Sequence, residues 1–599
     1  MFPVCPWRTM TESIMKKSRR IGLLVLTLAG ASLRAGERMP LWPEGKIPDF
    51  QDHQVGVMTD AMWLPGTWGK PNPAFKPEEH RMPYIEWYGK AENPNGACII
   101  LISGGSYQNC CDVNLVKKMW PNRLIELGYQ CVNFVYRTPR PKGLPIYQSA
   151  WQDGQRAVRL VRSEAAKRGF DPERIGLISM SAGGHLGVMM ATSSLTPAYE
   201  KVDELDDLPC HVNAAICNAP AYATGLGAAG GAAPQDGTLV PYPTINPCFK
   251  FDAKTCPISF HHGAVDPYSP NGSTLCYREV RKRNVPSELH LYADLGHGAH
   301  GLERAVEFLR QLNFDGRLGA EEERRIFTGT HTAEQVCEKL WPEGRVPSHS
   351  AAQTNTATLT WFVPKTLKTK AIQVIFPGGA YTHCNVRGEG RPVAEYFNAQ
   401  GMTAVVVEYR CPRPKNLPKH WTAWQDAQRA IRLVRAGAVA RGLDPERIGA
   451  MGFSAGGHLT LMTALSSTYP AYNPVDDVDK KVSCRVAWAC PIYPAYVLSD
   501  GADGAHARGG NDDKATLVPE LLFDVNTPPM CFVHGDADSI TAMGSVKVWE
   551  KLRRMGASSD LHTLATRGHC FQFKAAPGTG SWTWLDQVWD FLVRKGFVK

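Results

Sequence analysis

The sequence has 599 residues, of which 43% are hydrophobic and 21% charged, which argues against global disorder and leaves enough chain for two or more cores. The formal net charge is +9, and residues 1–35 contribute +5 of it. The remaining charge is small and scattered, so it does not indicate nucleic acid binding. The 17 cysteines follow neither a small-domain disulfide framework nor a paired zinc-ligand spacing.

The first 35 residues have the pattern of a secretory signal peptide. "MKKSRR" from Met15 is basic, and "IGLLVLTLAGA" over 21–31 is apolar but short for a bilayer span. Small residues up to Ala35 offer cleavage points. We therefore expect an extracytoplasmic protein, periplasmic or secreted, with a retained membrane anchor as the alternative. Arg19–Arg20 leaves the general and the twin-arginine export routes both open.

The rest of the chain contains one sequence pattern twice. "LWPEGKIP" from Leu41 matches "LWPEGRVP" from Leu340, and "RIGLISMSAGGHL" from Arg174 matches "RIGAMGFSAGGHL" from Arg447. The serines of the second pair are 273 residues apart, which indicates a duplicated domain and not a short solenoid repeat. We expect a first domain over 37–315, a linker over 316–335 and a second domain over 336–599.

Within each copy, apolar strand segments alternate with helical segments. In the first copy, strands are expected at 97–103, 130–137, 257–263 and 288–294, and helices at 149–169 and 301–313. Nearly continuous apolar strands separated by helices predict a mostly parallel sheet with helices on both faces.

A serine follows a strand and precedes a helix in each copy. In the second copy, Gly452-x-Ser454-x-Gly456 has the spacing of a nucleophile elbow, whose tight turn requires small neighbours. The first copy presents Ser181 in the same place, with Ser179 where the second has Gly452. The helix that follows directs its N–H groups and positive dipole end toward the reacting oxygen. We predict that Ser181 and Ser454 are nucleophiles.

A serine hydroxyl needs a base, and this type of fold presents an acid and then a histidine later in the chain. Asp266 and His297 follow Ser181, and Asp538 and His569 follow Ser454, with both pairs 272 residues apart across the copies. Asp536 is the rival of Asp538. The rival histidines are His261, His262 and His300 in the first copy and His534 and His562 in the second.

Glycine-rich turns after the first long strand of each copy, "ISGGSYQNC" and "FPGGAYTHC", bring backbone N–H groups close to a substrate. They predict an oxyanion hole in each copy, with a plain glycine turn as the alternative. The expected donors are Gly105, Ser106 and Ala182 in the first copy, and Gly379, Ala380 and Ala455 in the second.

The set "PGGAY", "EYRCPRP", "AWQDAQRAIRLVR", "DPERIGAMGFSAGGHL" and "HGDADS" resembles the α/β-hydrolase fold, and in particular bacterial carbohydrate esterases of the acetylxylan and feruloyl esterase-like group. The resemblance implies two tandem α/β-hydrolase domains. It further implies a serine carboxylesterase that hydrolyses acetyl or small aromatic esters, on polysaccharide, with a Ser-Asp-His triad in each copy. It implies no metal or organic cofactor. The small remaining charge and the lack of another long apolar run predict no nucleic acid or membrane partner after signal removal.

Several alternatives stay open at this stage. Ser179, and Ser103 in place of the proline of "PGGAY", leave the first copy either catalytic or a degenerate carbohydrate-binding copy. A serine peptidase of the same fold and a non-catalytic binding protein are the rival functions. The glycine-rich segments 222–247 and 497–514 are expected either to shape the substrate sites or to be inert insertions.

Overall fold

The computed structural model describes residues 36–54, 73, 83–89, 91–110, 120–224, 244–316, 331–351, 353–499, 515–565, 567–571 and 583–598. The expected signal segment 1–35, and most of the expected linker and of both glycine-rich segments, lie outside the described residues. We call residues 36–316 the first unit and residues 331–598 the second unit. None of the helices described is both long and apolar enough to cross a lipid bilayer.

In the first unit, the strands stand in the order β1-β2-β4-β3-β5-β6-β7-β8. They are parallel from β4 to β8, whereas β1 and β2 are antiparallel. The strands are β1 (Arg38–Pro40), β2 (Tyr84–Trp87), β3 (Cys98–Ile102), β4 (Gln130–Val135), β5 (Ile175–Met180), β6 (Ala214–Asn218), β7 (Ile258–Gly263) and β8 (Ser287–Tyr292). The helices are α2 (Trp120–Glu126), α3 (Gln148–Ser163), α4 (Ala165–Arg168), α5 (Ser181–Thr192), η3 (Glu204–Asp207), α6 (Asn271–Arg281) and α7 (Leu302–Gln311).

The second unit repeats this arrangement in the order β9-β10-β12-β11-β13-β14-β17-β18, and β15 and β16 pair separately. The strands are β9 (Thr332–Lys339), β10 (Thr358–Pro364), β11 (Ile372–Phe376), β12 (Thr403–Glu408), β13 (Ile448–Phe453), β14 (Trp488–Ile492), β15 (Leu498–Ser499), β16 (Thr516–Leu517), β17 (Cys531–Gly535) and β18 (Asp560–Leu564). The helices are η4 (Val386–Gly390), α8 (Arg391–Ala399), α9 (Trp421–Ala438), η5 (Val439–Arg441), α10 (Ala455–Leu465), α11 (Asp477–Lys481), α12 (Met543–Arg554) and α13 (Thr583–Arg594).

The second unit begins earlier than the sequence indicated. Residues 332–335 were expected in the linker, but they open strand β9, which pairs with β10 at the outer edge of the sheet. The side chains of β9 are mostly exposed or half-buried, so this strand lacks the apolar run that marks the inner strands.

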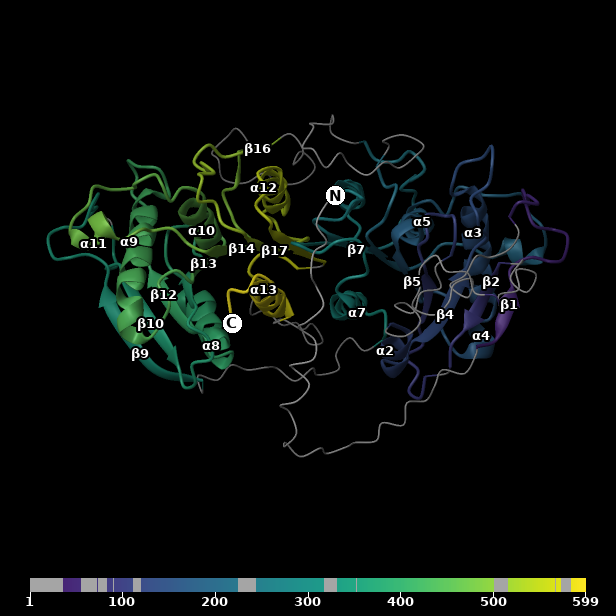
Figure 1. Ribbon diagram of the computed structural model, residues 1–599, viewed down its shortest axis with the longest axis horizontal. Coiled ribbons are helices and arrows are strands. Elements are labelled where there is room, and N and C mark those ends of the chain that lie inside the picture. The colour runs from purple at the N-terminus through teal and green to yellow at the C-terminus, as the bar shows by residue number, and fades with distance from the viewer. Residues whose placement is uncertain are drawn as a thin grey trace, which may run out of the picture.

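Helices cover both faces of the sheet (Figure 1). The core on one face lies under α3, α5 and α6 of the first unit and under α9, α10 and α12 of the second. The opposite face carries two separate cores, one under α2 and α7 and the other under α8 and α13. Inner strands such as β3 are buried on both faces, which explains their unbroken apolar sequence.

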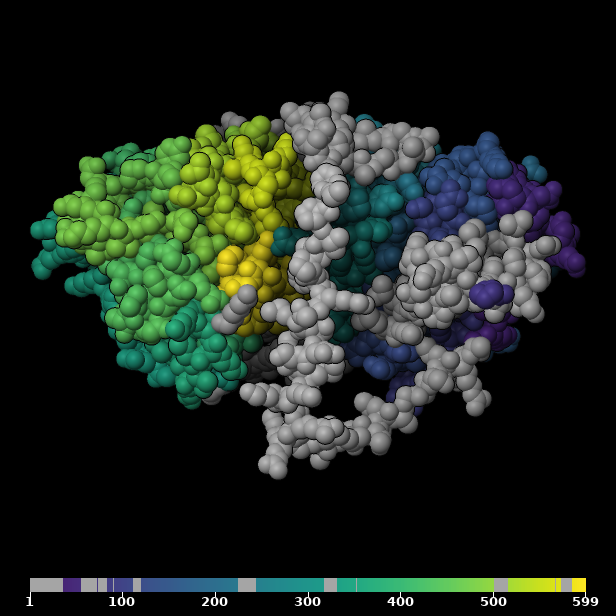
Figure 2. All heavy atoms as spheres, viewed as in Figure 1, coloured from purple at the N-terminus to yellow at the C-terminus, as the bar shows by residue number. Residues whose placement is uncertain are grey.

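The two units share one sheet of sixteen strands in the described part of the chain. Strand β8 pairs with β18 in antiparallel fashion, with His290 opposite His562. Figure 2 shows the units as two lobes side by side, the first in purple to teal and the second in green to yellow. The contacts are reciprocal, because the Ala565 N–H donates to Glu288 and the Ala293 N–H donates to Asp560. An approximate two-fold axis therefore passes between β8 and β18.

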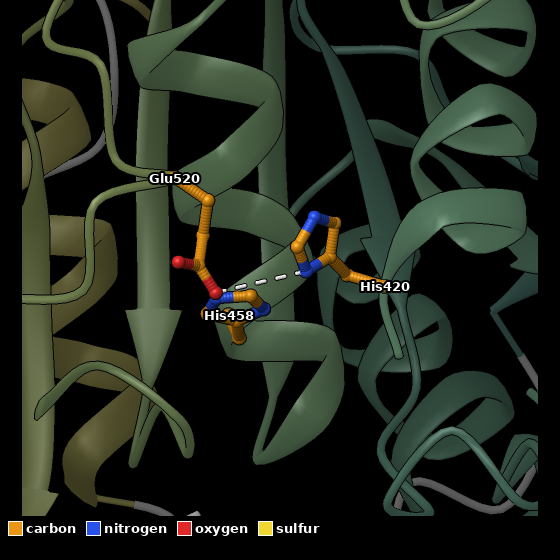
Figure 3. Close-up of side chains that lie close together, drawn as sticks. All are labelled: His420, His458 and Glu520. Carbon is orange, nitrogen blue, oxygen red and sulfur yellow. Dashed lines mark ion pairs between the residues drawn. The ribbon is translucent and has the colours of Figure 1, made fainter. Parts of the chain in front are cut away.

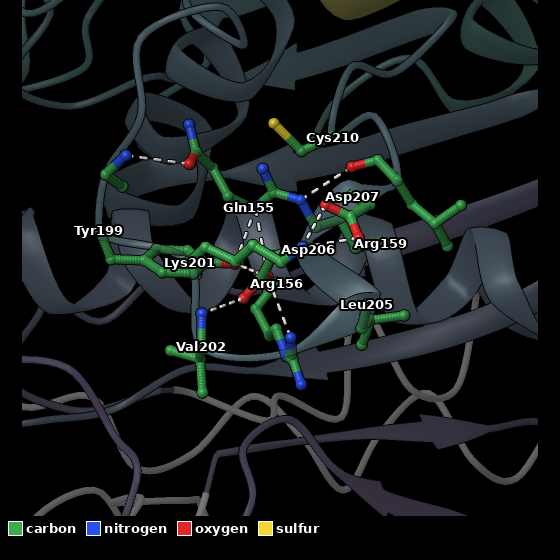
Figure 4. A network of polar contacts seen from close by, with 12 residues as sticks. Gln155, Arg156, Arg159, Tyr199, Lys201, Val202, Leu205, Asp206, Asp207 and Cys210 are labelled. Carbon is green, nitrogen blue, oxygen red and sulfur yellow. Dashed lines mark hydrogen bonds and ion pairs between the residues drawn. The ribbon is translucent and has the colours of Figure 1, made fainter.

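The repeated "QDxQRAxRLVR" segment fastens helix α3 to the chain that follows α5 (Figure 4). Arg156 donates to Asp203 over 2.6 Å and to Asp206 over 2.9 Å, and the Tyr199 hydroxyl donates to Asp206 over 2.6 Å. Arg429 makes the equivalent bonds in the second unit. This charged segment therefore holds the scaffold together and does not lie in a reactive centre.

Candidate active sites

Both predicted nucleophiles stand in a sharp turn between a strand and a helix. Ser181 directly follows β5 and Ser454 directly follows β13, with φ angles of 59° and 51°. L residues rarely adopt this backbone, and the surrounding packing must hold it in place. A Cβ added to Gly104 would lie 2.6 Å from the Ser181 Cβ, so only glycine fits beside the serine.

Two linked differences between the units explain why position 179 holds a serine and not a glycine. A Cβ on Gly452 would lie 2.2 Å from the Gly456 carbonyl oxygen and 2.5 Å from the Thr460 Oγ1, so glycine is needed there. In the first unit the position equivalent to Thr460 is Gly187, where an added Cβ would lie 2.2 Å from the Ser179 Oγ. Ser179 therefore occupies space that threonine fills in the second unit, and its hydroxyl donates to the Ile216 carbonyl over 3.2 Å. The exchange leaves the turn intact.

The structure brings Ser181, His297 and Asp266 together. The Ser181 hydroxyl lies 2.8 Å from Nε2 of His297, whose Nδ1 lies 2.8 Å from Oδ2 of Asp266. The Tyr268 N–H donates to the other carboxylate oxygen over 2.7 Å. Burial alone would raise the pKa of Asp266, but hydrogen bonds from His262 and His297 outweigh it and lower this pKa to about 2. The carboxylate is therefore ionised and able to hold the imidazole.

The second unit repeats this geometry with Ser454, His569 and Asp538. The Ser454 hydroxyl lies 2.9 Å from Nε2 of His569, and Nδ1 of His569 lies 2.8 Å from Oδ2 of Asp538. The Ile540 N–H donates to Oδ1 over 2.7 Å. Although burial would raise the pKa of Asp538, hydrogen bonds from His534 and His569 hold it far below its ordinary value.

The rival residues have other roles. His261 contacts the Ser259 and Tyr292 hydroxyls at 2.9 and 3.0 Å. The His300 ring contacts the carbonyl of Gly296. His262 and His534 lie beside the acids and contact the carbonyls of residues 268 and 540. His562 lies at the contact between the units, as does Asp536, which accepts from the Tyr277 hydroxyl over 2.6 Å.

The predicted oxyanion donors gather around the two serines. Gly105 and Gly379 both have φ of 128°, a conformation that favours glycine, and the residue after each also has a positive φ. The Tyr136 hydroxyl donates to the Ser103 carbonyl over 2.9 Å, and the Tyr409 hydroxyl donates to the Pro377 carbonyl over 2.7 Å, which fixes each loop. Within the described residues, no protein acceptor is bound to the N–H groups of Gly105, Ser106, Ala182, Gly379, Ala380 and Ala455.

Glu389 is a residue of the second site that the sequence did not indicate. Its side chain is buried in η4, where one carboxylate oxygen accepts from the Gly378 N–H over 2.6 Å and the other accepts from the Tyr493 hydroxyl over 2.9 Å. The Tyr493 ring packs edge-on against His569, with centroids 5.0 Å apart. Glu389 therefore connects the oxyanion loop to the histidine. Its equivalent in the first unit falls in 111–119, outside the described residues.

Each site opens to solvent on the side of its histidine. The side chains of His297 and His569 are 27% and 22% exposed, whereas those of Asp266 and Asp538 are fully buried. A substrate can therefore approach the serine and the imidazole while the carboxylate remains shielded from solvent. A nucleophile, a base, a buried acid and free N–H donors are the groups that acyl transfer requires.

Residues 87–219 and 359–552 match the BD-FAE family, one stretch in each unit and together more than half of the chain. The chain belongs to the BD-FAE family. Each stretch of BD-FAE sequence includes one of the two elbow serines. The predicted α/β-hydrolase fold and the resemblance to the acetylxylan and feruloyl esterase-like group are confirmed.

Relatives of this BD-FAE chain include named esterases. An acetylxylan esterase of Xylanibacter ruminicola is 26% identical over 36% of this chain and 44% of its own length. A probable carboxylic ester hydrolase, LipM of Mycobacterium tuberculosis, is 32% identical over 30% of this chain and 44% of its own length. The chain therefore spans about half the length of the curated relatives it matches. The solved structure of an acetyl ester-xyloside bifunctional hydrolase from Caldicellulosiruptor lactoaceticus is 28% identical over 44% of this chain and 97% of its own, with a TM-score of 0.36.

Proposed function

We propose that this protein is a serine carboxylesterase that hydrolyses acetyl or small aromatic esters on polysaccharides, with one active site in each unit. The observation that carries the proposal is the pair of serine–imidazole–carboxylate chains, with every link between 2.8 and 2.9 Å. The name of the Xylanibacter relative supports the acetyl ester, and membership of the BD-FAE family supports an esterase.

The geometry supports a two-step acyl transfer. The serine Oγ attacks the ester carbonyl carbon, and its proton passes to Nε2 of the histidine. The carboxylate accepts a hydrogen bond from Nδ1–H and stabilises the imidazolium, and the loop and helix N–H groups bind the oxyanion. The imidazolium then protonates the departing alcohol. Water, activated by the same histidine, cleaves the acyl-enzyme and restores the serine.

We propose that the first unit is catalytic, like the second. The distances between its serine, histidine and acid are 2.8 Å, against 2.8 and 2.9 Å in the second unit, and Gly187 makes the room that Ser179 needs. We further propose that residues 1–35 are a signal peptide and that the enzyme acts outside the cytoplasm. N-terminal sequencing of protein recovered from the periplasm or the medium tests this point, because a chain that retains residues 1–35 would contradict it.

The nucleophiles are tested with Ser181→Ala, Ser454→Ala and the double variant. Substrates are p-nitrophenyl acetate, acetylated xylan and a peptide amide. Each single variant is expected to keep the activity of the other unit, whereas the double variant loses roughly 10⁴-fold or more. A fluorophosphonate is expected to label two serines in the wild type and one in each single variant.

Full acetate hydrolysis by the double variant would contradict the assignment of both serines. Peptide cleavage without ester cleavage would favour a peptidase. Activity on p-nitrophenyl acetate but not on acetylated xylan would retain the esterase and contradict the polysaccharide substrate. One label per wild-type chain, together with full activity of Ser181→Ala, would identify the first unit as a non-catalytic copy.

A further inference from the structure

Two imidazoles and one carboxylate face one another in the second unit, outside its triad (Figure 3). His420 precedes α9, His458 lies on α10, and Glu520 follows β16. Oε1 of Glu520 lies 3.7 Å from Nδ1 of His420 and 3.8 Å from Nε2 of His458. These separations exceed hydrogen-bond length, so the carboxylate satisfies neither nitrogen directly.

Both facing nitrogens are buried, and neither has a hydrogen-bond partner in the part of the chain that the structure describes. His458 is fully buried and His420 is 7% exposed. Among the described residues, Nε2 of His458 and Nδ1 of His420 have no hydrogen-bond partner, a state that costs about 1–3 kcal/mol per group. Burial, aided by the nearby Lys419, lowers the pKa of His420 to about 4, and burial also lowers the pKa of His458. Both imidazoles are therefore neutral at neutral pH, which is the form that binds a metal.

The first unit lacks this arrangement and serves as an internal comparison. His185 is the equivalent of His458, but the positions of His420 and Glu520 hold Tyr147 and Cys248. Nε2 of His185 has partners there, 3.4 Å from the Cys248 thiol and 3.5 Å from the Asn246 amide. The buried histidine is thus common to both units. Only in the second do its neighbours at these two positions carry an imidazole and a carboxylate.

We propose that His420, His458 and Glu520 bind one Zn²⁺ or a similar first-row divalent cation. Zinc bonds of 2.0–2.2 Å place tetrahedral ligand atoms about 3.3 Å apart, so the carboxylate needs to close on each imidazole by roughly half an ångström. The three ligand atoms lie within 4.8 Å of one another, so the two imidazoles also need to approach each other. The Glu520 side chain is 24% exposed, which gives it the freedom to move and leaves the fourth position to water. Nδ1 of His458 lies 2.8 Å from the Tyr381 hydroxyl, the type of outer contact that orients a ligating imidazole.

The cation has a structural link to the catalytic loop. Tyr381 directly follows Ala380, one of the predicted oxyanion donors, and the His458 N–H donates to the Ser454 carbonyl in the first turn of α10. A bound cation would fix the position of His458 and, through Tyr381, the loop. The cation contacts no reacting atom in this arrangement, and its binding is measured independently of esterase activity.

The site is tested on the untagged full-length protein, stripped with a chelator, dialysed and titrated with ZnCl₂ against a chromophoric competitor. One Zn²⁺ per chain is expected. His420→Tyr, which introduces the residue of the first unit, and Glu520→Gln are each expected to weaken binding at least tenfold. Cys248→Ala is the matched control in the first unit and is expected to bind like the wild type.

Folding and binding are separated by two further measurements. Circular dichroism and thermal melting of the metal-free proteins show whether each variant folds, and Zn²⁺ is expected to raise the Tm of the wild type but not of the variants. Co²⁺ is expected to give the visible absorption of a tetrahedral site in the wild type alone. The proposal is overturned if the wild type binds no stoichiometric Zn²⁺, or if its binding survives in His420→Tyr/Glu520→Gln.

Discussion

The exchange between Ser179 and Gly452 depends on the residue that faces each position from the following helix. Each elbow contains one small residue and one larger one, Ser179 with Gly187 in the first unit and Gly452 with Thr460 in the second. The two differences together keep the side-chain volume inside the turn nearly the same in both units, as close packing requires. The departure from the expected glycine is therefore compensated locally and does not indicate a degenerate site.

This compensation predicts coupled substitutions, measured on a Ser181→Ala background so that only the second site reacts. Gly452→Ser is expected to destabilise the second unit by about 1–3 kcal/mol and to slow fluorophosphonate labelling of Ser454, because the added atoms meet the Gly456 carbonyl and Thr460. Gly452→Ser/Thr460→Gly is expected to recover the part of both losses that comes from the contact with Thr460. A double variant no better than Gly452→Ser, in melting temperature and labelling rate, would contradict the explanation.

The acid of the first triad predicts a pH dependence of stability. The pKa of Asp266 is about 2 in the folded protein and about 3.9 in an unfolded chain. Since the folded value is the lower one, the ionised carboxylate stabilises the fold fully above about pH 4, and this contribution disappears as the pH falls toward 2. Asp266→Asn is therefore expected to have a lower Tm than the wild type at pH 6, with a difference that shrinks below pH 4.

The same substitution, measured with Ser454→Ala, is expected to lower acetate hydrolysis by the first unit roughly 10⁴-fold, because the imidazole loses its orientation. A Tm difference that stays constant or grows on acidification would contradict the low pKa of Asp266. Activity within tenfold of the parent would remove Asp266 from the triad.

At the scale of elements, the oxyanion loop of the second unit depends on η4. Glu389 in η4 binds both the Gly378 N–H and the Tyr493 hydroxyl, so it positions the loop and the ring that packs on His569. On the Ser181→Ala background, Glu389→Gln is expected to lower kcat about tenfold and leave KM within about twofold, because loop donors act mainly in the transition state.

Tyr493→Phe is the graded control, since it removes the hydroxyl that donates to Glu389 and keeps the ring. It is expected to have a smaller effect on kcat than Glu389→Gln. If Glu389→Gln lowers only the melting temperature and leaves kcat unchanged, Glu389 stabilises the unit and does not position the loop.

The sequence predicted the elements that have a strong local signal. Buried strands such as β3 and β13 are continuous apolar runs, and the elbow serines lie where short-range spacing placed them. The start of β9 was missed because an edge strand with half-exposed, charged side chains looks like a linker. Glu389 and the His420–His458–Glu520 cluster were missed because their parts come from separate segments without a fixed spacing, and only the fold brings them together.

For the whole molecule, duplication within one chain has allowed the contact between the units to become asymmetric. Arg278 on α6 and Glu550 on α12 occupy equivalent positions, 272 residues apart, and they pair across the approximate axis at 2.9 Å. In a dimer of identical units, each of these residues would face a copy of itself and meet a like charge. The covalent repeat permits opposite charges there, which favours contact between the two different units over contact between like units.

The Arg278–Glu550 pair predicts a charge-reversal cycle in the full-length protein. The side chains are 13% and 10% exposed, so solvent screens the pair only partly. Arg278→Glu and Glu550→Arg are each expected to lower the stability of the contact between the units by about 2 kcal/mol or more. Each variant places two like charges side by side where solvent is largely excluded. Arg278→Glu/Glu550→Arg is expected to recover most of the loss, read as urea unfolding midpoints and as resistance to limited proteolysis between the units. Lys282→Glu is the matched control on the same side of the contact, since Lys282 is 46% exposed, its partner Glu279 is half-buried, and such surface pairs contribute less than about 1 kcal/mol. A double variant as unstable as the single ones, or a Lys282→Glu variant as unstable as Arg278→Glu, would show that the charges of Arg278 and Glu550 do not select the contact between the units.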